Sequence, residues 1–224
     1  MIKNLSFELN LLKQRLLQVG TEVEASLIKA EKALLEFDQQ LASEIIAADT
    51  GIDTLEISVE ESCLRILAQH TPVASDLRFV VTVLKVNIDL ERIGDLTAKI
   101  ADRILLLSRP DCLPASGRQK LLFPDQFRDM FTETIKMVKT SLDSFVDMDA
   151  DRAYQVLVWD DAVDLAKSAI RTQAEQTVRH DAGLQQCLGM VLSVSRSLER
   201  IADHATHIAE DVIYMLQGQI VRHG

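Results

Sequence analysis

A short segment of this 224-residue chain occurs twice with almost the same sequence. The first copy, LERIGDLTAKIAD, runs from Leu90 to Asp102, and the second, LERIADHATHIAE, runs from Leu198 to Glu210. The copies align without a gap, and seven of the thirteen positions are identical. A repeat of this kind, placed about half the chain apart, indicates an internal duplication. Both halves of the chain are therefore expected to adopt the same fold.

The duplication extends beyond this motif. A shift of 111 residues superimposes four further identical residues: Asp38 on Asp149, Ala42 on Ala153, Asp49 on Asp160 and Asp53 on Asp164. The shift becomes 108 at Glu91 and Glu199. The three-residue difference fits in a turn between two elements, so the whole unit is predicted to be duplicated.

The repeated unit is predicted to be helical. Apolar residues recur at steps of three and four over most of the chain, and the sequence has only 8 Gly, 4 Pro and 4% aromatic residues. Six long helices are expected, the third opening at Thr71 and Pro72 as cap and first helical residue. The expected ranges are 5–37, 39–70, 72–108, 126–146, 149–180 and 182–217.

Helix-breaking residues divide the chain into two parts. The segment 109–125 holds three of the four prolines and no apolar periodicity. We therefore predict an all-α protein with two tandem, pseudo-symmetric three-helix bundles. The predicted bundles are residues 1–109 and 125–224, joined by a linker at 110–124.

The repeated motif also places carboxylates on one face of a helix. Glu91 and Asp95 are four residues apart, so they stand about 40° apart around the helix axis. Leu90, Ile93 and Ile100 fall on the opposite side and form the expected buried stripe. The acidic residues of both halves are therefore predicted to face away from the core.

Four such acidic pairs coincide between the two halves. If the second and third helices of each bundle pack side by side, each half presents four carboxylates in one patch. Oxygen-rich patches select hard cations, so magnesium, calcium, manganese or iron is the expected metal. The candidate ligands are Asp49, Asp53, Glu91, Asp95, Asp160, Asp164, Glu199 and Asp203.

Two interpretations of these pairs stay open, because most acidic pairs simply decorate a solvated helix face. His207 lies four residues after Asp203 and is placed to join a cation site, whereas Lys99 holds the matching place in the first half and is placed to neutralise the patch. The remaining histidines, including His204, are interpreted as helix-end or surface residues. The two patches therefore need not be equivalent.

Charge and composition exclude several classes of protein. The net charge of −10 argues against general binding to nucleic acid or anionic lipid. Cys63, Cys112 and Cys187 form no CxxC pair, so reduced thiols are expected rather than a zinc site or a disulfide framework. The sequence begins with no signal-like pattern and has no apolar run long enough to span a bilayer. A soluble cytoplasmic protein is expected.

The same residues resemble the PhoU family of regulators of bacterial phosphate uptake. The resemblance rests on both LERI-x-D motifs, on HTPVASDLRFVVTVLKVNIDLERIGD and on ERIADHATHIAEDVIYMLQGQIVRH at the C-terminus. It implies metal clusters held by the four acidic pairs, and a homodimer. It also implies a negative regulator, not an enzyme, that couples the ATPase of the phosphate ABC transporter to a phosphate-sensing histidine kinase.

A carboxylate metalloenzyme built on a helical bundle is the alternative. Enzymes of the di-iron class use inward-facing glutamates together with Glu-x-x-His motifs. This chain contains no Glu-x-x-His, and its repeated acidic residues are predicted to face outward. The sequence therefore favours a binding and regulatory module over an enzyme.

Overall fold

The computed structural model describes residues 5–109, 112 and 123–221, which form six long helices and one short 3₁₀ helix. The predicted six-helix, all-α fold is confirmed. The helices are α1 (Leu5–Glu36), α2 (Gln39–His70), α3 (Ala74–Leu107), α5 (Pro124–Asp147), α6 (Ala150–His180), η1 (Ala182–Leu184) and α7 (Gln185–Gln217).

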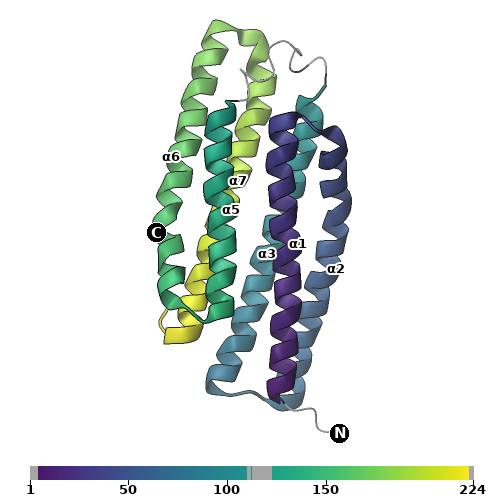
Figure 1. Ribbon diagram of the computed structural model, residues 1–224, viewed down its shortest axis with the longest axis vertical. Helices are drawn as coiled ribbons and strands as arrows, with labels where there is room; N and C mark the ends of the chain where they lie inside the picture. The colour runs from purple at the N-terminus through teal and green to yellow at the C-terminus, as the bar shows by residue number, and fades with distance from the viewer. Residues whose placement is uncertain (1–4, 110–111, 113–122, 222–224) are drawn as a thin grey trace.

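The helices form two three-helix bundles that lie side by side (Figure 1). Helices α1, α2 and α3 pack together, as do α5, α6 and α7. The bundles meet where α3 packs on α7 and where α1 packs on α5. Polar contacts cross this junction too, since Lys13 Nζ of α1 donates to the Val146 carbonyl of α5 at 2.6 Å. The third helix of each bundle thus lies at the centre of the molecule.

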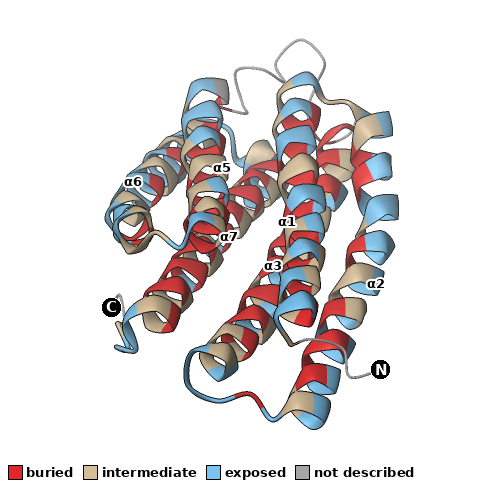
Figure 2. Cartoon of the chain, turned by 60° about the horizontal axis from the view of Figure 1, so that its bottom comes forward, coloured by how far each residue is buried: buried red, intermediate tan, exposed pale blue. Residues whose placement is uncertain are grey.

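The buried side chains follow the apolar stripes predicted from the repeats. Leu90, Ile93 and Ile100 of α3 are fully buried, as are Leu198 and Ile201 of α7. Buried residues of all six helices form one hydrophobic cluster, and in Figure 2 they line the facing sides of the helices. The two bundles therefore share a core, which explains why neither third helix has a wide solvated face.

Both copies of the unit begin their second helix in the same way. Asp38 caps α2 by accepting a hydrogen bond from the Leu41 amide at 2.9 Å, and Asp149 caps α6 by accepting from the Arg152 amide at 3.1 Å. The residue before each cap, Phe37 or Met148, has a positive φ. An aspartate at this position satisfies one of the free amides of the first helical turn. Equivalent caps at matched positions support the duplication.

The start of the third helix differs from the prediction. The structure begins α3 at Ala74, with Val73 at its N-cap and no side-chain cap, whereas Thr71 ends α2 in the left-handed region with φ 42°. The chain reverses direction between α2 and α3 within three residues, so Thr71 is already used by the helix end. Proline also disfavours helical geometry in the residue before it.

The expectation that all cysteines are reduced is wrong for two of them. Cys112 and Cys187 form a disulfide, with their Cα atoms 5.5 Å apart, that ties the segment after α3 to the first turn of α7. They are 75 residues apart in sequence, so spacing does not reveal the pairing. Cys63 is a buried free thiol, and burial raises its pKa to about 12.

The domain boundaries stay a prediction. Most of the predicted linker at 110–124 lies outside the described residues, which include only Cys112, Phe123 and Pro124 of it. Across the described part of the chain, no helix has an apolar stretch long enough to cross a bilayer.

Candidate functional site

The first candidate site is the acidic cluster of α2 and α3, formed by Asp49, Asp53, Glu91 and Asp95. The helices come close at Gly94, where an added Cβ would lie 3.4 Å from Ile52 and 3.5 Å from Asp49 Oδ1. Asp53 is exposed and the other three acids are half-buried at the helix contact. The structure therefore brings the predicted residues of this half together at the surface, outside the core.

These carboxylates repel one another. Burial raises the pKa of Asp49 above its usual value, and the carboxylates of Asp53, Asp95 and Glu91 raise it further. Burial also raises the pKa of Glu91, against the opposing charge of Arg92. The raised pKa values mean that ionising all of these carboxylates costs free energy. A bound cation would lower that cost.

Glu56 is a fifth acid of the first cluster that the sequence analysis missed. Its pKa is raised by burial and then by Glu60, Glu91 and Asp53. Buried Asn87 of α3 holds it in place by donating from Nδ2 to Glu56 Oε1 at 3.2 Å and to the Glu56 carbonyl at 3.0 Å. The available signal was its position three residues after Asp53, on the same face of α2.

Two cations on α3 lie beside the first cluster. Lys99 Nζ is 3.4 Å from Asp95 Oδ2, as its spacing predicted, and Arg92 lies 3.4 Å from Glu91 and 3.7 Å from Asp95. Both cations are more than half exposed, so solvent weakens their pairing. They offset part of the negative charge of the cluster.

The second acidic cluster, formed by Asp160, Asp164, Glu199 and Asp203 on α6 and α7, contains a lysine that sequence reasoning missed. Lys167 Nζ of α6 lies 2.7 Å from Glu199 Oε1 of α7 and 3.7 Å from Asp164 Oδ1. The hydrogen bond to Glu199 is the main reason that the pKa of Lys167 is raised.

The negative charge of the second cluster nevertheless affects the pKa of Asp203. Burial raises the pKa of this carboxyl, and the charges of Glu199 and Asp160 raise it further. All four predicted acids of this half therefore lie near one another, but Lys167 already sits between α6 and α7 as a counter-charge.

Within each acidic cluster the carboxylate oxygens are spread along the helices. In the described residues, the one group of three side chains whose metal-binding atoms all lie within 4.8 Å of one another is a different set, the histidine cluster of Asp89, His204 and His207. Binding one ion in an acidic cluster thus needs side-chain rotation. The oxygen donors themselves suit hard cations.

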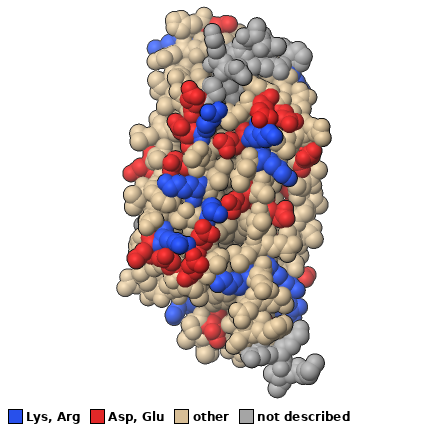
Figure 3. All heavy atoms as spheres, in the orientation of Figure 1, with Lys and Arg blue, Asp and Glu red and all other residues tan. Residues whose placement is uncertain are grey.

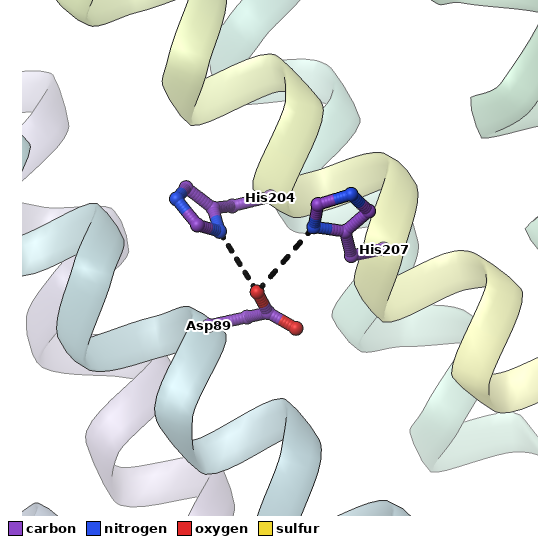
Figure 4. A group of neighbouring side chains, drawn as sticks. All are labelled: Asp89, His204 and His207. Atoms are coloured by element: carbon purple, nitrogen blue, oxygen red, sulfur yellow. Dashed lines mark hydrogen bonds and ion pairs between the residues drawn. The ribbon is translucent and has the colours of Figure 1, made fainter. Parts of the chain in front are cut away.

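The histidine cluster lies between the two bundles (Figure 4). Asp89 Oδ1 of α3 lies 2.8 Å from His204 Nδ1 and 3.7 Å from His207 Nδ1, both on α7. The Asp89 and His204 side chains are 14% and 17% exposed, so the prediction of His204 as a helix-end or surface residue is wrong. His207 was expected beside Asp203, but its Nδ1 also approaches Asp89. The i, i+3 spacing of the two histidines was the signal in the sequence.

The wider surface carries both signs of charge. On the face shown in Figure 3, acidic and basic side chains are interspersed. The net charge of −10 is thus not gathered into one large acidic patch on this face. Local clusters of acidic residues, rather than the net charge of the protein, therefore distinguish the candidate sites from the rest of the surface.

The fold and the duplicated clusters define a tandem three-helix-bundle protein with paired surface carboxylates. The family model for the PhoU domain matches the chain twice, at residues 16–104 and 127–212. The chain belongs to the PhoU family.

Curated relatives cover nearly the whole chain. The phosphate-specific transport system accessory protein PhoU homolog of Pseudomonas aeruginosa is 37% identical over 96% of this chain and 86% of its own length. The phosphate-specific transport system accessory protein PhoU of Escherichia coli is 32% identical over the same shares. These relatives are named accessory proteins of transport rather than enzymes.

Two solved structures have the same fold as this chain. The crystal structure of PhoU from Pseudomonas aeruginosa is 34% identical, with a TM-score of 0.89 over 96% of this chain and 100% of that one. The phosphate transport system regulatory protein PhoU from Streptococcus pneumoniae is 28% identical, with a TM-score of 0.86 over 98% of this chain and 100% of that one. The two tandem bundles are thus the fold of the family.

Proposed function

We propose that this protein is a negative regulator of phosphate uptake and of the response to phosphate starvation. It would act as an adaptor that binds the ATPase of a phosphate ABC transporter and a phosphate-sensing histidine kinase. The observation that carries the proposal is the match of both halves to the PhoU domain, together with relatives named for phosphate transport over almost the full chain.

The surface is compatible with protein binding. Several apolar side chains lie exposed on the outer helices, including Val158 and Leu165 of α6, which are both 71% exposed. Ile57 and Leu64 of α2 are 53% and 54% exposed. Long helical faces with apolar and charged residues offer a partner both contact area and specificity. They also support the proposal that the protein forms a homo-oligomer.

We further propose that the two acidic clusters bind divalent or trivalent cations such as magnesium, calcium, manganese or iron. The ligands would come from Asp49, Asp53, Glu91, Asp95, Asp160, Asp164, Glu199 and Asp203. Their oxygen donors and the raised pKa of Asp49, Glu91 and Asp203 support this assignment.

Deletion of the gene tests the regulatory function. In phosphate-replete medium, the deletion strain is expected to express a phosphate-starvation reporter that the parent strain represses, and a plasmid copy is expected to restore repression. Normal repression in the deletion strain would contradict the proposal. Co-purification of the transporter ATPase or the kinase with the chromosomally tagged protein tests the adaptor role separately.

The proposed compartment is the cytoplasm. Immunoblotting of cytoplasmic and periplasmic fractions checks this, and recovery of the protein mainly from the periplasm would contradict it. Light scattering of the purified protein gives the oligomeric state, and a monomer at cellular concentration would contradict the proposed homo-oligomer.

A further inference from the structure

The histidine cluster joins the two halves of the molecule where α3 packs on α7 (Figure 4). We propose that Asp89, His204 and His207 bind one divalent first-row transition metal ion, such as Zn²⁺, Co²⁺ or Fe²⁺. None of its ligands belongs to the two acidic clusters, but Asp203 of the second cluster lies close to both histidines. The proposal does not depend on the regulatory function proposed above.

The distances suit a single ion. The three ligand atoms all lie within 4.8 Å of one another, and Asp89 Oδ1 lies 2.8 Å and 3.7 Å from the two imidazole nitrogens. Ligands bound to one zinc ion at about 2.0–2.1 Å are roughly 3.0–3.4 Å apart. His207 is 56% exposed, so rotation of its side chain can close the remaining distance without moving either helix.

The donor atoms select a different metal from the acidic clusters. Imidazole nitrogen suits zinc, iron, copper and nickel, whereas carboxylate oxygen alone suits magnesium, calcium and manganese. Two histidines with one carboxylate also leave coordination positions open for water. The histidine cluster is therefore expected to bind transition metals even when Mg²⁺ is abundant.

The cluster is open to solvent on one side. A surface pocket beside it is lined by Lys85, Ile88, Asp89, His207, Glu210 and Asp211. Lys85 is paired with Asp211 at 2.5 Å, so its positive charge is largely compensated. The pocket therefore gives a cation a route to the histidines past neighbouring carboxylates.

The duplication shows that the fold does not require these donors. With the shift of 108 residues, His204 matches Leu96, His207 matches Lys99 and Asp89 matches Ser197. The matched helix positions thus pack with an apolar residue and a lysine. Residues of the types that bind metals occur together at only one of the two matched positions of the α3–α7 contact. This favours a specific role over a packing requirement.

A hydrogen bond between helices is the alternative explanation. It accounts for Asp89 and His204, which are 2.8 Å apart and mostly buried. It does not account for His207, which is exposed and 3.7 Å from the carboxylate. His207 is therefore the residue whose substitution separates a metal site from a structural pair.

Titration of the untagged full-length protein with Co²⁺ tests the proposal. The visible absorption of Co²⁺ is recorded in excess Mg²⁺, which occupies sites that take hard cations. We expect one Co²⁺ per chain, displaced by Zn²⁺. His207→Asn is expected to weaken Co²⁺ binding by more than the roughly 10- to 100-fold caused by loss of an outer-shell partner. His180→Asn, at the exposed end of α6, is the matched control and should bind as the parent does.

Further measurements distinguish loss of the metal ligand from unfolding of the variant. Asp89→Asn should also lose Co²⁺ binding, and saturating Zn²⁺ should raise the melting temperature of the parent and of His180→Asn but not of His207→Asn. Circular dichroism without metal checks that each variant is folded. Absence of a Co²⁺ spectrum in the parent, or equal affinity in His207→Asn, would overturn the proposal. Binding that survives in Asp89→Asn and fails in Asp203→Asn would overturn it as well, by placing the ion on the second acidic cluster.

Discussion

The two acidic clusters arose from one duplicated unit, yet they differ in charge at a matched position on the second helix of each bundle. With the shift of 111 residues, Glu56 of α2 corresponds to Lys167 of α6. Glu56 adds a fifth carboxylate to the first cluster, whereas Lys167 binds Glu199 at 2.7 Å in the second. The first cluster thus has five carboxylates beside two mostly exposed cations, Arg92 and Lys99, whereas the less exposed Lys167 lies between the acids of the second cluster. Duplication preserved the geometry while the electrostatics diverged.

The structure changes how the two clusters compare as cation sites. In the sequence, Lys99 is placed to neutralise the first cluster and His207 to join a cation site in the second. In the structure Lys99 is 61% exposed and only partly balances the first cluster, whereas Lys167 competes directly with any ion at Glu199. We therefore expect hard cations to bind more tightly to the first cluster.

The largest expected effect is on manganese affinity. The double variant Glu91→Gln, Asp95→Asn should weaken the tightest Mn²⁺ binding by roughly 100-fold, because affinity follows the number of charged oxygen ligands. The matched variant Glu199→Gln, Asp203→Asn should change that binding by less than about tenfold, which corresponds to about 1.4 kcal/mol. Mn²⁺ titration followed by electron paramagnetic resonance measures both. Equal losses in the two variants would remove the proposed asymmetry.

Exchange of charge at the divergent position should shift affinity in opposite directions. Glu56→Lys is expected to weaken Mn²⁺ binding to the first cluster by roughly tenfold, and Lys167→Glu to strengthen binding to the second cluster by a similar factor. Calorimetric titration of each single variant measures these shifts. The conservative variants Glu56→Gln and Lys167→Gln should show smaller shifts of the same sign, and no shift in either series would show that this position does not set cation affinity.

The matched glycine and alanine on the third helices test whether packing also differs. Gly94→Ala places a methyl group in ordinary contact with Ile52 and should raise the unfolding free energy by about 0.5–1 kcal/mol, because glycine weakens helix interiors. Ala202→Gly should lower it by at least as much, since Ala202 is fully buried. Urea denaturation at neutral pH measures both. A loss of stability in Gly94→Ala would mean that the α2–α3 contact has no room for a methyl group.

The smallest expected effect is a pH-dependent change in stability from Asp49. The pKa of this carboxyl is raised in the folded state, so folding favours its protonated form. The ionised form costs stability, and this cost appears as pH rises from about 3.8 through the raised folded pKa. Asp49→Asn should therefore gain a few tenths of a kcal/mol relative to the parent between pH 4 and pH 7, the gain being small because solvent screens the site.

Urea denaturation without divalent ions, at several pH values, measures the effect of Asp49→Asn. Glu22→Gln, an exposed substitution on α1, controls for loss of a carboxylate elsewhere. Adding Mg²⁺ should shrink the difference between Asp49→Asn and the parent, because the cation relieves the repulsion. A difference that grows as pH falls would contradict the assigned cause.

Much of the fold could be predicted from local patterns of apolar residues in the sequence. The apolar steps predicted α2 at its observed bounds and placed Leu90, Ile93 and Ile100 in the core. The helix start at Ala74 and the disulfide of Cys112 with Cys187 were not predicted. The first depends on how sharply two packed helices must turn, and the second on which distant segments meet, and neither leaves a local pattern.

The candidate sites divide in the same way. Helical spacing was enough to put Glu91 beside Asp95 and Glu199 beside Asp203. It did not show that Glu56 and Lys167 reach across to the neighbouring helix, because that depends on the rotation of each helix about its own axis. His204 was misjudged because its partner, Asp89, is 115 residues away in the other half of the chain.

The sequence by itself determined the helices, the duplication and the faces on which the acidic residues lie, because these follow from the 3.6-residue period and the pattern of apolar side chains. Only the tertiary structure decided which charges meet and where the two halves place Asp89 against His204 and His207. Such contacts depend on how helices distant in sequence cross, and the burial of apolar surface that drives this packing does not specify the charges brought together at its edge.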